Sequence, residues 1–136
     1  GRDGDAFIEI DIMEAWFSSE YGKVHAHIHD WTARPKHAAG IAIDLPDAIS
    51  KFHVYAVEIG SDGVRFYIDD KLVWTVPRLR KFVKNYRPTG GFHIIANLAI
   101  GSGLYRPSST WNPPPDPTTA FPQTLQIDWI KVWKRG

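Results

Sequence analysis

The segment from Ala6 to Trp16 constrains the fold more than any other part of the chain. Isoleucine stands at every second position within it and acidic residues stand between, which is the two-residue period of a β-strand with one buried face. A regular strand would place the isoleucines on one face and the first two acids on the other: Ile8, Ile10 and Ile12 against Glu9 and Asp11. We therefore expect a strand with an apolar face and an acidic face.

Glu14 does not fit this alternation, because a regular strand would place it on the isoleucine face. A lone carboxylate is costly to bury. A β-bulge near Ile12 and Met13 resolves the conflict, since one additional residue shifts the alternation and returns Glu14 to the side of Glu9 and Asp11. The segment is then predicted to carry three carboxylates in a row on one face. An acidic, solvated edge strand is the alternative interpretation.

The run from Glu9 to Glu14, Glu-Ile-Asp-Ile-Met-Glu, resembles the E-x-D-x-x-E catalytic strand of glycoside hydrolase family 16, the laminarinase, agarase and carrageenase group. Other blocks resemble the family in the same order along the chain, at residues 24–29, 52–72, 92–101 and 121–134. Three features depart from the family pattern. No Trp-Pro pair precedes the acidic strand, Ile59 replaces the usual Trp, and Asp70 replaces the usual Gly.

This resemblance implies an all-β fold, a concanavalin A-like β-jelly-roll sandwich of two antiparallel sheets, as a single domain over residues 1–136. It further implies a retaining, endo-acting glycoside hydrolase that cleaves a β-linked polysaccharide by double displacement. Glu9 would be the nucleophile, Glu14 the acid/base, and Asp11 the carboxyl between them. β-1,3-Glucan is the expected substrate. Agar- or carrageenan-type galactans are the alternative substrates, and a non-catalytic carbohydrate-binding domain of the same fold is the alternative function.

Residues 23–29 form a second alternating segment, which we expect to return antiparallel to the first after a turn at residues 18–22. Its three histidines, His25, His27 and His29, would share one face. Three interpretations stay open: a zinc or copper site, a polar lining of the sugar cleft, or a solvated face. By resemblance, the Ile28-His29 step matches the end of the family's "TIH".

Further site residues are predicted from single positions. His29 and Trp31 are expected to bind substrate beside the acids, and Trp111 to lie on the rim of the cleft in a long proline-rich loop. Asn97 is expected either to line the floor of the cleft or to fix a bulge, because a polar group in an apolar run must be hydrogen-bonded. By resemblance, Asp128 would help bind a structural calcium ion; a solvent-facing aspartate is its alternative interpretation.

The other expected strands follow from apolar and alternating runs between turn residues. A tight turn at residues 60–63 would join two of them as a hairpin. The run at residues 90–101 is nearly all apolar, as in a strand buried on both faces. The expected strands are residues 40–45, 51–59, 64–69, 71–75, 90–101 and 121–134.

Composition excludes several classes of protein. With 136 residues, of which 43% are hydrophobic, the chain suits one folded domain. Its net charge of +1 gives no basic stripe for nucleic acid, and no apolar run is long enough to span a membrane. It has no cysteine, which excludes disulfides and thiolate metal sites. The family resemblance implies a polysaccharide as the partner and a catalysis that requires no cofactor.

Two expectations concern the context of the chain. By resemblance to extracellular polysaccharide hydrolases, we expect it to be secreted. Family domains carry further strands before the catalytic one, whereas the acidic strand here begins close to residue 6. Unpaired strand edges and apolar surface would result. We therefore expect a missing amino-terminal segment, or self-association, to complete the sheets.

Overall fold

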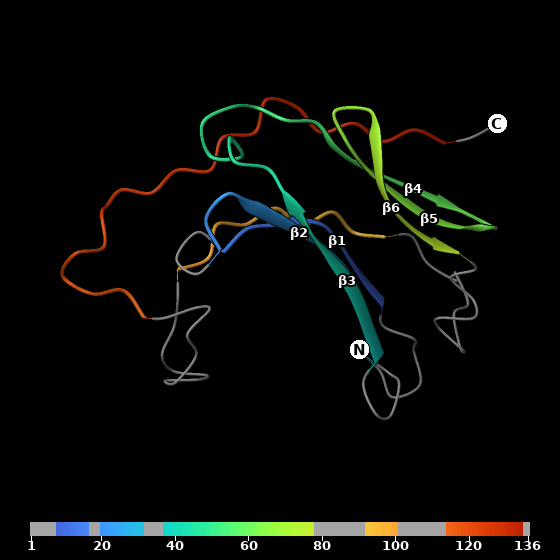
Figure 1. The fold of residues 1–136 in the computed structure, drawn as a ribbon, viewed down its shortest axis with the longest axis horizontal. Helices are drawn as coiled ribbons and strands as arrows, with labels where there is room; N and C mark the ends of the chain where they lie inside the picture. Colours follow the sequence, from blue (N-terminus) through green and yellow to red (C-terminus); the bar gives the residue numbers. More distant parts are fainter. Residues whose placement is uncertain (1–7, 17–19, 32–36, 78–91, 101–113, 135–136) are drawn as a thin grey trace. The chain divides into compact units, whose positions relative to one another are not determined.

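The computed structural model of the chain describes five stretches: residues 8–16, 20–31, 37–77, 92–100 and 114–134. The chain forms two compact units, Gly1–Gly91 and Phe92–Gly136. All assigned strands among the described residues lie in the first unit (Figure 1). The single domain expected over residues 1–136 stays a prediction, because each unit is described by itself.

The first sheet contains the acidic strand and the histidine strand. Its strands are β1 (Ile8–Glu14), β2 (Lys23–Asp30) and β3 (His37–Asp44), in the order β1-β2-β3, and both pairs are antiparallel. β2 lies between its two neighbours (Figure 1). The alternation in residues 6–16 and 23–29 therefore predicted both strands and their pairing correctly.

The second sheet is a meander of β4 (Tyr55–Gly60), β5 (Gly63–Ile68) and β6 (Lys71–Pro77), again antiparallel and in sequence order. Two-residue turns join its strands, at residues 61–62 and 69–70. The expected hairpin turn at residues 60–63 is confirmed, since Gly60 pairs with Gly63. The expected strand at residues 51–59 is partly wrong, because pairing begins only at Tyr55.

A small apolar core holds the two sheets together. Ala26 and Ile28 of β2 pack with Val64, Phe66 and Val76 of the second sheet, and all five are buried. Burial of a side chain as large as that of Phe66 contributes about 1.5–3 kcal/mol. The predicted all-β sandwich of two antiparallel sheets is confirmed in this unit. Because β2 places its apolar face on the core, the opposite face, which carries its histidines, points away from it.

The strands expected at residues 90–101 and 121–134 are not found in the described part of the second unit. Residues 92–100 and 121–134 carry no strand assignment and are exposed, with Ile95 at 84% and Val132 at 77% exposure. An apolar run favours a strand, but a strand also requires a partner for its backbone hydrogen bonds. The apolar pattern therefore indicated that these segments favour a strand conformation, but it did not identify a strand with which they pair. None of the described residues belongs to a helix that could cross a membrane.

Asp69 and Asp70 form the turn between β5 and β6 with an unusual backbone for non-glycine residues. Their φ angles are +49° and +64°. A two-residue hairpin turn of type I′ requires positive φ at both central residues and favours Asp-Gly. Asp70 occupies the position where glycine would fit at less conformational cost.

We predict that Asp70→Gly stabilises the protein by about 0.5–1 kcal/mol, because the side chain no longer opposes the left-handed conformation. Asp70→Ala is the control, and it should destabilise the protein because alanine lacks the local hydrogen bonding that lets aspartate adopt this conformation. Urea denaturation measures both changes. A lower stability of Asp70→Gly would contradict the interpretation of the turn.

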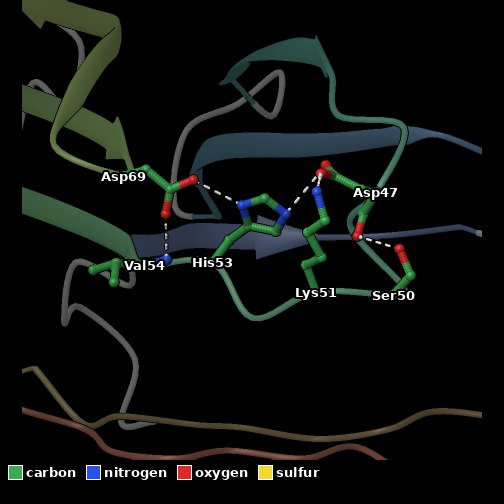
Figure 2. Close-up of polar contacts among 6 residues, drawn as sticks. All are labelled: Asp47, Ser50, Lys51, His53, Val54 and Asp69. Atoms are coloured by element: carbon green, nitrogen blue, oxygen red, sulfur yellow. Dashed lines mark hydrogen bonds and ion pairs between the residues drawn. The ribbon is translucent and has the colours of Figure 1, made fainter.

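His53 connects the loop before β4 to this turn. Its Nδ1 lies 2.7 Å from Asp69 Oδ2, and its Nε2 lies 3.2 Å from Asp47 Oδ1 (Figure 2). The second contact is an ion pair when His53 is protonated. Asp69 Oδ1 also accepts a hydrogen bond from Val54 N at 2.9 Å, and Lys51 Nζ lies 3.0 Å from Asp47 Oδ2 (Figure 2). This cluster fixes the start of the second sheet.

The cluster changes the pKa values of its members in opposite directions. The hydrogen bond to Asp69 raises the pKa of His53 above 6.5, against the opposing effect of burial. The same bond lowers the pKa of Asp69 below 3.8, and the hydrogen bond from Lys51 lowers that of Asp47. The His53 contribution to stability is thus full below pH 6.5 and is lost as pH rises through its raised pKa. The carboxylate contributions are lost only as pH falls through their lowered values.

We predict that His53→Gln lowers the free energy of unfolding by at most about 1 kcal/mol near pH 5.5, since Asp69 is half exposed and solvent screens the pair. Glutamine keeps a hydrogen-bond donor but carries no charge. The difference from wild type should shrink as pH rises through the raised pKa of His53, because the wild-type side chain then loses its charge. Thermal denaturation over a series of pH values tests this. A difference that stayed constant with pH would contradict a role for the charge.

Candidate active site

The pairing of β1 with β2 places the three acids and three histidines on one face of the first sheet. Glu9 lies opposite His29, Asp11 opposite His27, and Glu14 opposite His25; directly opposite residues project to the same side.

The register shifts between Asp11 and Glu14, which confirms the predicted bulge. It also corrects the expectation for Ile12. Ile8 and Ile10 pack against the core, whereas Ile12 lies within the bulge and is 38% exposed.

Each carboxylate contacts a ring that lies two residues further along the chain than its direct cross-strand partner. Glu14 Oε2 lies 2.6 Å from His27 Nδ1, and Asp11 Oδ2 lies 3.3 Å from His29 Nε2. Trp31 Nε1 donates a hydrogen bond of 2.5 Å to Glu9 Oε2. Such diagonal neighbours in an antiparallel pair are within reach of long side chains. The three acids are thus each held by a different ring.

The rings themselves form a continuous row along this face. Adjacent ring centroids are 4.0 Å apart for Trp16 and His25, 6.0 Å for His25 and His27, 5.5 Å for His27 and His29, and 5.1 Å for His29 and Trp31. The spacing of the three histidine rings follows from their alternate positions on one strand, which place side chains on the same face. Flat rings beside carboxylates form a surface suited to the apolar face of a sugar.

Asp11 has the most perturbed environment among the three acids. Burial, the charges of Glu14 and Glu9, and a hydrogen bond to Glu9 raise its pKa to about 7. Each of these effects disfavours a third negative charge. Near neutral pH, Asp11 can therefore carry a proton and donate a hydrogen bond to the carboxylate of Glu9. A neutral Asp11 does not repel the two glutamates.

Gly40 of β3 provides the space that His27 occupies. The two residues are direct cross-strand partners. A Cβ atom at position 40 would lie 1.9 Å from His27 Cδ2 and 2.4 Å from its Nε2. The ring edge that carries Nε2 therefore faces β3, and Nδ1 is the nitrogen that faces Glu14. A glycine inside a strand marks such a close approach.

We predict that Gly40→Ala destabilises the protein by about 1–3 kcal/mol, the usual cost of overpacking, because the ring of His27 must move. In a His27→Ala background the same substitution should cost nothing or should stabilise, since the space is then open. Urea denaturation of the four variants forms a double-mutant cycle. An equal cost in both backgrounds would show that the ring of His27 does not depend on this space.

The predicted substrate-binding residues have different positions. His29 and Trp31 lie at the acidic face, where they contact Asp11 and Glu9 respectively. Asn97 is an exposed residue of the second unit. Trp111 lies outside the described residues. The binding roles of all four stay predictions.

Sequence reasoning did not identify Trp16, Glu20 or Gly40 as parts of this face. Glu20 Oε2 lies 3.2 Å from the buried Nε2 of His25, without hydrogen-bond geometry. The signal for Gly40 was present, since a glycine interrupts an otherwise apolar strand. Trp16 and Glu20 follow β1 in the connection to β2, and no pattern indicated their direction.

One cluster in the described part of the chain offers three potential metal ligands. It contains Asp11, His27 and His29, whose donor atoms lie within 4.8 Å of one another. The sequence had suggested His25 with the other two histidines, whereas the structure replaces His25 by the acid of the neighbouring strand. Asp128, predicted to bind calcium, is exposed in the second unit and belongs to no such cluster among the described residues. A calcium site there stays a prediction.

Comparison with known proteins agrees with this geometry. Residues 2–131 match the family described as glycosyl hydrolases family 16. The chain belongs to this family. Its acidic strand, bulge and neighbouring histidine strand therefore lie in a glycoside hydrolase fold, and a polysaccharide is the class of substrate that membership implies.

Two curated relatives are similar over most of the chain. A β-glucanase from Rhodothermus marinus is 32% identical over 136 residues, which cover 93% of this chain and 44% of the relative. Glucan endo-1,3-β-glucosidase A1 from Niallia circulans is 28% identical over 137 residues, covering 93% of this chain and 19% of the relative. The chain thus spans less than half the length of either protein. No solved structure matched the chain.

Proposed function

We propose that this chain carries the catalytic face of a retaining, endo-acting hydrolase of β-1,3-glucan. The observation that supports it most directly is the bulged strand β1, which places Glu9, Asp11 and Glu14 on one face beside a row of rings. The names of the two relatives, a β-glucanase and a glucan endo-1,3-β-glucosidase, support glucan rather than galactan as the substrate.

In the proposed mechanism, Glu9 attacks the anomeric carbon and Glu14 donates a proton to the departing sugar oxygen. A covalent glycosyl–enzyme ester forms, and water activated by Glu14 then breaks it, which returns the proton to Glu14. Trp31 orients Glu9 through its Nε1–H. A protonated Asp11 donates to Glu9 in the resting state, which keeps the nucleophile in place. His27 holds the carboxyl of Glu14 on the side of the sheet where the substrate binds.

The lack of the family's Trp-Pro pair before the acidic strand favours a second candidate function, a domain that binds the polysaccharide without cleaving it. The two candidates differ in one observable. A hydrolase releases reducing ends from laminarin, whereas a binding domain retains the polymer intact. We also propose that the chain acts outside the cell, where a polymer of this size is accessible, and that its hydrolysis requires no cofactor.

We predict that Glu9→Gln and Glu14→Gln each lower reducing-sugar release from laminarin by about 10³-fold or more, because each removes a group needed in the transition state. The two roles separate on an aryl β-glucoside with a good leaving group. There, Glu14→Gln should retain far more activity than Glu9→Gln in the first step, since such a leaving group needs little protonation.

Glu58→Gln is the matched control, because Glu58 lies in β4 of the other sheet, where it accepts a hydrogen bond from Tyr67. It should retain activity on both substrates. Near-full activity of Glu9→Gln or Glu14→Gln would contradict the assigned roles. Binding of laminarin by a folded wild-type chain without release of reducing ends would select the second candidate.

A further inference from the structure

Two imidazoles and a carboxylate converge at the centre of the acidic face. We propose that Asp11, His27 and His29 form a binding site for a divalent transition-metal ion of the zinc type. One donor atom of each residue lies within 4.8 Å of the others. The side chains are partly buried, with exposures of 15%, 22% and 27% in the same order. The site is therefore sheltered but open to an ion from solution.

The distances require only a small contraction. Tetrahedral zinc with bonds of about 2.0–2.2 Å places its ligand atoms roughly 3.3–3.6 Å apart. Asp11 Oδ2 and His29 Nε2 already lie 3.3 Å apart. The remaining distances, at most 4.8 Å, close by about 1 Å through rotation of side chains. The strand pairing of β1 with β2 needs no change.

The fold holds these donors in place before a metal arrives. His27 and His29 are alternate residues of one strand, and their rings stack at 5.5 Å. Trp31 stacks on the other side of His29 at 5.1 Å. Gly40 receives the Nε2 edge of His27, which leaves Nδ1 directed to the side of β1. A preformed donor set reduces the cost of ordering ligands on binding.

The donor types select the ion. Imidazole nitrogen with one carboxylate oxygen suits zinc and copper, whereas calcium and magnesium prefer sites made of oxygen alone. Three protein ligands leave a fourth position for water or another small ligand. His27 supplies the second imidazole nitrogen, which completes the set of three donors.

Metal binding has a consequence for the proposed hydrolysis, and this part of the inference rests on the proposed function. The ion would occupy Nδ1 of His27, the nitrogen that lies 2.6 Å from Glu14 Oε2. It would also bind the carboxyl of Asp11, between the two glutamates. Both contacts would withdraw groups that hold the proposed acid/base and nucleophile. Zinc should therefore inhibit hydrolysis in proportion to its occupancy.

The test measures binding of Zn²⁺ alone to the 136-residue chain by isothermal titration calorimetry. We expect one saturable site per chain, and a Kd at least about tenfold weaker for Asp11→Asn, His27→Thr and His29→Gln. His53→Gln is the matched control, because His53 also lies between two carboxylates but in a different cluster. It should bind Zn²⁺ as the wild type does, and far-UV circular dichroism verifies that each variant is folded.

A second measurement uses the wild type only, so that it does not depend on the folding of variants. Substoichiometric Cu²⁺ should broaden the ring proton signals of His27 and His29 before those of His53. Absence of a saturable Zn²⁺ site would overturn the proposal. Zn²⁺ binding that is unchanged in His27→Thr, or Cu²⁺ broadening that begins at His53, would place the metal elsewhere and overturn it equally.

Inhibition separates this proposal from the proposed function. A chain that binds Zn²⁺ but releases no reducing sugar even without added metal would support the metal site and contradict the hydrolase. Hydrolysis that continues unchanged at full Zn²⁺ occupancy would contradict the inhibitory consequence and leave the hydrolase supported. A chelator should restore the activity lost with Zn²⁺, because the ion binds reversibly to preformed side chains.

Discussion

The antiparallel ladder between β1 and β2 is the constraint on which the rest of the site depends. Its register places three acids opposite three histidines, and its bulge between Asp11 and Glu14 returns the third acid to the same face. Without the bulge, Glu14 would project toward the core, where an ionised carboxyl has no partner. One irregularity in backbone pairing thus converts an alternating strand into a concentrated acidic face.

β2 connects this face to the stability of the fold. Its apolar residues Ala26 and Ile28, at 1% and 0% exposure, pack against the second sheet, and its histidines face the acids. The same backbone therefore serves the core on one side and the polar site on the other. Repulsion among the acids is balanced locally, because each contacts a ring nitrogen and the pKa of Asp11 rises to about 7. The charge of the site is lower than three carboxylates would suggest.

The sequence predicted much of the first unit because its signals are local. Alternation indicated β1, β2 and the meander, and the misplaced Glu14 indicated the bulge. The same reasoning was wrong for residues 90–101 and 121–134, where the described residues carry no strand. A hydrophobic run reports how a segment would behave against a partner, but it does not say which segment that partner is. The roles of Asn97 and Asp128 in these two segments stay predictions, and so does that of Trp111, which lies outside the described residues.

The sequence by itself determined which residues share a face, since the two-residue period of a strand is a property of the backbone. It thereby placed Glu9 with Asp11, and His25, His27 and His29 together, and the misfit of Glu14 to this period indicated the bulge. Only the tertiary structure decided which acid meets which ring. Each carboxyl contacts a diagonal neighbour, Trp31 contacts Glu9, and Gly40 makes room for His27. These contacts depend on the register and relative position of separate strands, which no periodicity within one strand encodes.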